Sequence, residues 1–113
     1  MLLYTTEPDA VRAILRDVFG FPHVNAGEGW LIFALPPAEL GVHPGEGPAF
    51  EAGVRHLVSF MCDDIEATVA DLRARGVTVK GEPVNRGYGI VADLELPGGL
   101  ELQVYQPRHA TAI

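Results

Sequence analysis

The stretch VRHLVSFMCDDIEATVADLRARGVTVK, residues 54–80, decides the fold. Its first part, Val54–Met61, mixes β-branched and aromatic residues and predicts a strand. The middle part has apolar residues at helical spacing and predicts a helix over about Ile65–Arg75. A second strand is expected at Val77–Lys80. The stretch therefore predicts a strand–helix–strand unit.

The ends of this helix are marked by residues that commonly cap helices. Asp63 or Asp64 can accept a hydrogen bond from the first free backbone amides, and Gly76 can close the last turn. One face of the helix is apolar, through Ile65, Val69 and Leu72.

The residues that follow predict two more strands. A turn-rich stretch, Gly81–Gly89, leads into the strand Ile90–Leu96. Pro97, Gly98 and Gly99 form a tight turn, and Leu100–Tyr105 is the closing strand. The second half of the chain is thus predicted as a βαβββ unit.

The first half has a similar order of elements. A helix is expected over about Pro8–Phe19, with Thr6 as its N-cap and Gly20 at its end. Three strands are expected around it, and a Gly- and Pro-rich linker follows; these segments are Leu2–Tyr4, Gly29–Leu35, Glu39–His43 and the linker Pro44–Gly53.

The two halves match well enough to suggest an internal duplication. Both helices carry apolar residues at the same spacing, and both halves close with an alternating strand followed by a proline. We therefore expect one α+β domain of two tandem βαβββ modules, about 1–48 and about 52–110.

Composition excludes several classes of function. The 113 residues carry a net charge of −7, and the eight basic residues are scattered, so nucleic acid and anionic membranes are poor partners. No apolar run reaches the roughly 18 residues that a membrane span needs, and the N-terminus does not resemble a signal peptide. We expect a cytoplasmic protein. The one cysteine, Cys62, is expected to be a small buried hydrophobe.

The second half resembles the vicinal oxygen chelate superfamily, which includes glyoxalases, bleomycin resistance proteins and extradiol dioxygenases. The resemblance rests on His56–Phe60, on Asp63–Ala67 and on Leu96–Gln103 with its Pro-Gly-Gly turn. The first half matches more loosely, through Val18–Phe21 and Trp30–Phe33.

This resemblance implies that the two modules form a curved mixed sheet, shaped as a cup, with the helices on the outside. A divalent metal (Zn, Fe, Mn or Ni) often lies inside the cup in this family. His56 stands where the family has a metal-binding His, and Gln103 stands where it usually has a Glu. Glu39 is near the family's other Glu position, and Glu101 and His43 are the alternatives. The first strand of the first half lacks a matching ligand.

Strand alternation gives an independent expectation for these residues. In the closing strand, Glu101, Gln103 and Tyr105 share a face opposite the apolar residues, which must meet the helices. By the same reasoning Glu39 and His43 face the cup. We therefore expect His56, Gln103 and one side chain of the Glu39–His43 segment to share one concavity.

Two functions remain open at this stage. One is a metal-dependent lyase, isomerase or dioxygenase acting on a small molecule with vicinal oxygens. The other is a metal-free binding protein that sequesters a hydrophobic or cationic drug or toxin. The pocket residues expected in either case are Trp30, Phe60, Tyr88 and Tyr105. The resemblance also implies a homodimer, which would cover exposed sheet edges.

Overall fold

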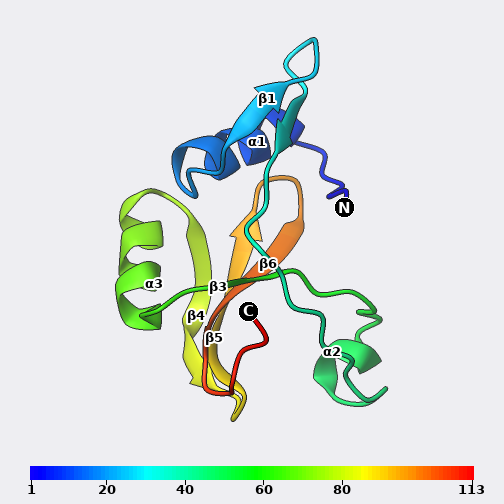
Figure 1. Ribbon diagram of the computed structural model, residues 1–113, viewed down its shortest axis with the longest axis vertical. Helices are drawn as coiled ribbons and strands as arrows, with labels where there is room; N and C mark the ends of the chain where they lie inside the picture. Colours follow the sequence, from blue (N-terminus) through cyan, green and yellow to red (C-terminus); the bar gives the residue numbers. More distant parts are fainter.

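The computed structural model describes residues 1–113 and has an α+β fold with two separate sheets (Figure 1). No helix has both the length and the apolar character to span a membrane. The elements, in chain order, are α1 (Pro8–Asp17), β1 (His23–Asn25), β2 (Leu31–Phe33), α2 (Pro48–Glu51), β3 (Ser59–Met61), α3 (Ile65–Ala74), β4 (Thr78–Asn85), β5 (Gly89–Leu96) and β6 (Leu100–Pro107).

The larger sheet has the strand order β3-β6-β5-β4. β3 pairs with β6 in parallel, and the other neighbours are antiparallel. With α3 between β3 and β4, this sheet is the βαβββ unit that the sequence predicts for the second half.

Helix α3 begins and ends where the sequence indicates. The Asp64 carboxylate accepts a hydrogen bond from the Ala67 amide at 3.1 Å, and Gly76 adopts a φ of +83°, which favours glycine. For α1 the predicted cap was wrong. Glu7 is its N-cap residue, and the Thr5 hydroxyl, rather than Thr6, accepts from the Glu7 amide at 3.1 Å.

The hydrophobic core lies between the helices α1 and α3 and one face of the larger sheet. Leu94 in β5 is completely buried, and Val104 in β6 is almost so. The buried cluster consists of Val11, Leu15, Ile65, Val69, Leu72, Val77, Ala92, Leu94, Leu96, Leu102 and Val104. Helices α1 and α3 both pack on this one face, so neither of them lies on the opposite face, which is here called the helix-free face.

The first half forms fewer strands than predicted. Leu2–Tyr4 and Glu39–His43 are not strands, because residues 1–6 and 35–43 make no backbone-to-backbone hydrogen bonds. The strand predicted over Gly29–Leu35 shortens to β2 and pairs with β1, which is not among the predicted strands. This hairpin stands apart from the larger sheet at one end of the molecule (Figure 1).

Smaller differences concern strand and linker boundaries. β4 extends to Asn85, into the stretch predicted as turn-rich, and its pairing with β5 is irregular between Lys80 and Val84. β3 covers only the last three residues of the predicted strand Val54–Met61. The linker contains the single-turn helix α2.

The N-terminal segment is attached to the turn between β5 and β6. The Thr5 hydroxyl donates to the Pro97 carbonyl at 2.6 Å. Gly98, with a φ of +79°, leaves no room for a side chain here, since a Cβ would overlap Thr5 Oγ1 and lie 2.7 Å from the Thr6 amide nitrogen. Gly99 has a similar φ, yet nothing lies within 4 Å of its Cβ position.

Replacement of Leu94 should test the core. We expect Leu94→Ala to lower the free energy of unfolding by about 3 kcal/mol, because it leaves a cavity between sheet and helices. Leu57→Ala is the matched control at a 59% exposed leucine, with an expected change of about 0.5 kcal/mol or less. Urea denaturation measures both, and equal losses would contradict this assignment of the core.

Substitution of the adjacent glycines Gly98 and Gly99 tests the contact between the N-terminal segment and this turn. Gly99→Ala should cost about 1 kcal/mol, because alanine disfavours positive φ. Gly98→Ala should cost at least about 1 kcal/mol more, since its methyl group must displace the Thr5 segment. Thermal and urea unfolding of the two variants give the difference, and equal stabilities would mean that this contact contributes nothing.

Candidate functional site

The helix-free face of the larger sheet carries a row of hydrogen-bonded polar side chains. Gln103 lies between Ser59 and Asp93 in the sheet register. Its carbonyl oxygen accepts from the Ser59 hydroxyl at 3.1 Å, and its amide nitrogen donates to the Asp93 carboxylate at 3.4 Å. Gln103 is only 8% exposed, so water competes little for these hydrogen bonds. The two bonds therefore fix the orientation of its side chain on the sheet.

The next positions on this face are acidic, with one lysine among them. Glu101 and Glu95 are directly opposite each other, and Lys80 donates to Glu101 at 2.6 Å. The Glu101 hydrogen bond and charge raise the pKa of the Lys80 ammonium, with smaller effects from Glu95 and Asp93. All four side chains are exposed, so this end of the face is a solvated, predominantly negative surface.

The other end of the face is aromatic. The Tyr105 ring makes an edge contact with Tyr88 at 6.2 Å and stacks with His109 at 6.3 Å between ring centroids. Gly89 makes room for Tyr105, because a Cβ there would lie 2.9 Å from the ring. Burial raises the pKa of the Tyr105 hydroxyl, and the charges of Glu39 and Tyr88 add to the effect. The hydroxyl therefore stays protonated at neutral pH and remains able to donate a hydrogen bond.

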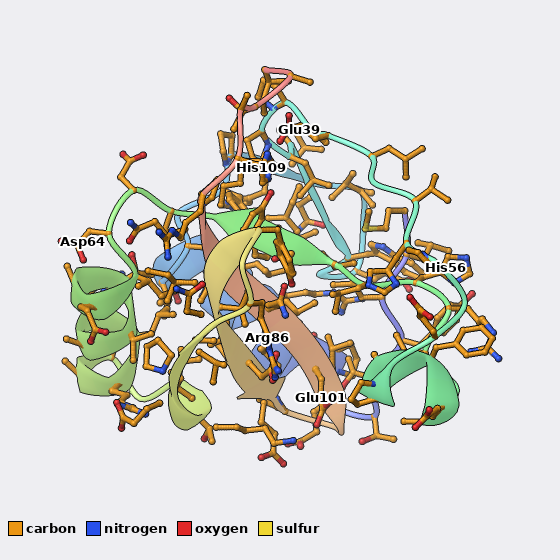
Figure 2. The ribbon with its side chains drawn as sticks, turned by 90° about the horizontal axis from the view of Figure 1, so that it is seen from below. Glu39, His56, Asp64, Arg86, Glu101 and His109 are labelled. Carbon is orange, nitrogen blue, oxygen red and sulfur yellow. The ribbon has the colours of Figure 1, made fainter.

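The structure does not bring the expected metal ligands together as one set, although Glu101 and Gln103 share a face of β6. Figure 2 shows Glu39 near His109, His56 at another edge of the molecule and Glu101 at a third. His56 precedes β3 in an exposed segment, and His43 is exposed with Nδ1 2.7 Å from the carbonyl oxygen of Pro44. No group of three or more His, Cys, Asp or Glu residues is close enough to hold a metal ion.

The sheet register gives the physical reason for the position of His56. Ser59 pairs with Gln103 and shares its face, so Val58 and Phe60 point toward the helices, where they pack against the core. If β3 extended back to His56, the alternation of side chains would point His56 toward the helices as well. The expected concavity shared by His56, Gln103 and the Glu39–His43 segment is therefore not formed within one chain.

The four expected pocket residues fall into two groups. Tyr88 and Tyr105 lie together at the aromatic end of the sheet. Phe60 packs instead on the helix side, 5.3 Å from both Phe19 and Phe21. Trp30 is 54% exposed near the hairpin, with the Arg12 guanidinium 5.4 Å from its ring.

Sequence reasoning missed Ser59, Asp93, Gly89 and His109, which all contact the face described above. Alternation within each strand was readable from the sequence. Which residue of one strand lies beside Gln103 or Tyr105 depends on the pairing register, which a single sequence does not reveal.

Cys62 is half-buried and packs against the core. Burial raises the pKa of its thiol, so the reactive thiolate is disfavoured. This agrees with its reading as a small hydrophobe.

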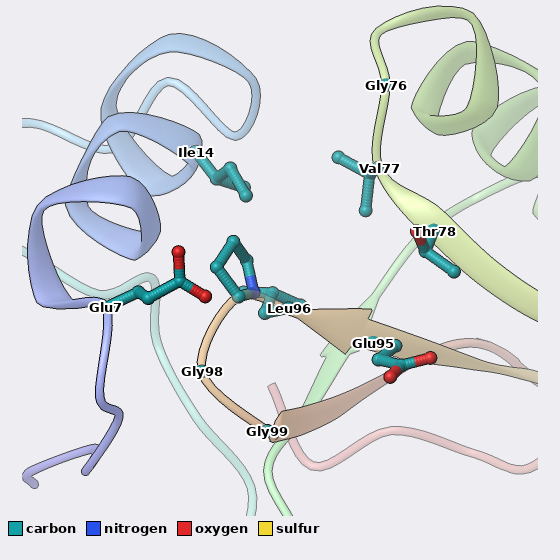
Figure 3. A pocket seen from close by; sticks show the side chains of 10 residues that line it. Glu7, Ile14, Gly76, Val77, Thr78, Glu95, Leu96, Gly98 and Gly99 are labelled. Carbon is teal, nitrogen blue, oxygen red and sulfur yellow. The ribbon is translucent and has the colours of Figure 1, made fainter.

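The structure also has two open hollows, and the larger of them reaches this face only at its acidic end, through Glu95. The larger, about 480 Å³, separates the start of α1 from the turn between β5 and β6, with Glu7 pointing into it (Figure 3). The smaller, about 340 Å³, lies against the hairpin and is lined by Val24, Ile32 and Phe33 among others. Neither contains an expected metal ligand.

Comparison with known proteins adds to this geometry. The model of the Glyoxalase/Bleomycin resistance protein/Dioxygenase superfamily matches residues 1–104. No curated protein matches the chain.

Solved structures with the same fold include an antibiotic binding protein, a glyoxalase/bleomycin resistance protein and an enzyme. TnmS3, an antibiotic binding protein from Streptomyces sp. CB03234, is 25% identical with a TM-score of 0.63; the match covers 93% of this chain and 90% of TnmS3. A glyoxalase/bleomycin resistance protein from the same strain is also 25% identical, with a TM-score of 0.60 and coverage of 92% and 95%.

The enzyme is the lactoylglutathione lyase of Agrobacterium tumefaciens. It is 20% identical over 92% of this chain and 88% of its own, with a TM-score of 0.63, and at this identity the likeness concerns the fold. With the family model spanning nearly the whole chain, the protein belongs to the Glyoxalase/Bleomycin resistance protein/Dioxygenase superfamily.

Proposed function

We propose that this chain is a small-molecule binding protein of the antibiotic-binding type, which holds its ligand on the helix-free face of the larger sheet without a resident metal. The observation that carries the proposal is the aromatic pair Tyr88 and Tyr105, with the Tyr105 ring packed against Gly89. The polar residues Gln103 and Asp93 lie further along the same face. Aromatic walls with a few fixed polar groups are typical of small-molecule sites. The likeness to the antibiotic binding protein TnmS3 supports the same function.

The donor set argues against a metal-dependent reaction in a single chain. A catalytic zinc or iron site needs three protein ligands with a position left open. Here the Gln103 carbonyl oxygen is already engaged by Ser59, and His56 lies in another part of the molecule. A metal-dependent lyase or dioxygenase would therefore require ligands from a second copy, and His56, Gln103 and Glu39 remain the residues predicted for it.

We also propose that the protein is a homodimer. Leu40 and Val42 are each 92% exposed, and their segment has no backbone partner in its own chain. Val24 and Ile32 expose a further apolar area on the hairpin. A second copy could cover these side chains and pair with the free backbone groups.

Binding of a neutral aromatic probe tests the proposed function. We expect saturable binding of 2-naphthylmethanol, followed by ligand-observed NMR, that is unchanged by excess EDTA. Tyr105→Ala should weaken it about tenfold, since a lost aromatic contact costs about 1 kcal/mol or somewhat more. Tyr4→Ala, at an 84% exposed tyrosine, is the matched control and should bind like the original protein.

Elemental analysis separates the two functions. The binding-protein proposal expects far less than one metal ion per chain in the purified protein. One zinc, iron, manganese or nickel ion per chain, lost on His56→Ala, would establish the metal-dependent alternative instead. Probe binding abolished by EDTA would point the same way.

The molecular mass of the protein in solution tests the proposed dimer. We expect light scattering to give twice the chain mass, and Val42→Lys to shift the protein toward monomer because a buried ammonium opposes association. Ala70→Lys on the exposed side of α3 is the charge-matched control and should leave the mass unchanged. A monomeric original protein would refute the proposal.

A further inference from the structure

One carboxylate at the aromatic end of the sheet has an oxygen with no partner. Glu39 Oε1 is shielded from solvent and accepts no hydrogen bond. The other oxygen, Oε2, accepts from the amide of Ala112 in the C-terminal segment. Glu39 takes part in none of the five ion pairs of the chain. A shielded carboxylate without a cation is costly, so an incoming positive group would gain its full attraction here.

This carboxylate lies near the aromatic end of the sheet. Glu39 is close enough to Tyr105 for its charge to act on the phenol, and Figure 2 shows Glu39 near His109. Tyr105 in turn contacts Tyr88 and stacks with His109. The Arg108 amide donates to the Tyr88 carbonyl at 2.8 Å, which holds the start of the C-terminal segment beside Tyr88. The shielded carboxylate thus lies close to this aromatic cluster.

Building on the proposed small-molecule function, we propose that Glu39, Tyr88 and Tyr105 form a subsite for the ammonium group of an organic cation. An N–H of the ligand would donate to Glu39 Oε1, while the ring faces attract the positive charge. The net charge of −7 would favour the approach of such a ligand.

An organic cation fits this subsite better than a bare metal ion. Hard divalent cations need about six oxygen ligands, and softer ones need several nitrogen or sulfur ligands. The subsite offers one free carboxylate oxygen and carbon-rich ring faces. Those faces attract an ammonium group that carries an apolar body, which can occupy the adjoining part of the sheet.

The test compares two probes of nearly equal shape at about pH 8, where histidine side chains are ordinarily neutral. These are 2-naphthylmethylammonium and the uncharged 2-naphthylmethanol, titrated by NMR into the full-length protein. We expect the ammonium compound to bind at least tenfold more tightly. Glu39→Gln should remove this preference and leave binding of the alcohol nearly unchanged. Glu46→Gln, an equal change of charge at an exposed position of the linker that follows, should preserve it.

The outcomes distinguish this inference from the function on which it rests. If both probes bind equally well, or if Glu46→Gln acts as strongly as Glu39→Gln, the ammonium subsite is refuted while small-molecule binding stands. If neither probe binds, both proposals fail. Circular dichroism and unfolding curves of each variant ensure that a lost preference reflects the subsite and not a lost fold.

Discussion

The pairing of β6 with β3 on one side and β5 on the other is the constraint on which the rest of the structure depends. Side chains alternate along each strand, so this register sends Leu102 and Val104 to the helices and Gln103 and Tyr105 to the opposite face. A shift by one residue would bury Glu101 and Gln103 under α1 and α3. The helices can therefore pack only on the face that the register makes apolar.

The same constraint explains the chemistry of the helix-free face. Gln103 is buried within a sheet, so its amide needs partners, and the register supplies Ser59 and Asp93. Because both of these hydrogen bonds are formed, the Gln103 side chain links β3, β6 and β5 and is poorly available as a metal ligand. The aromatic end owes its shape to Gly89, which lets the Tyr105 ring lie close to the backbone. Recognition of a small molecule suits this arrangement better than metal chemistry within one chain.

The two halves of the molecule are unequal in structure although their sequences are similar in pattern. The second half is complete because its closing strand lies between two neighbours. The corresponding segment of the first half, Glu39–His43, has the same alternation and no strand beside it. Its inward residue, Glu39, lies by the aromatic end of the larger sheet, and its apolar residues face solvent. The proposed dimer and the proposed ammonium subsite concern opposite sides of this one segment.

The sequence by itself determined the α+β class, the βαβββ order of the second half, the positions of α1 and α3, and the family. These follow from local patterns: apolar spacing in α3, the cap at Asp64, the glycine at its end, and the Pro-Gly-Gly turn before β6. Alternation in β6 also placed Glu101, Gln103 and Tyr105 on one face correctly. Only the tertiary structure decided which side chains meet there. Strand register decides that Gln103 contacts Ser59 and Asp93. It also decides that Tyr105 contacts Gly89 and His109, and that His56 lies apart from all of these residues. Register is set by packing across the whole sheet, and local sequence carries little information about it.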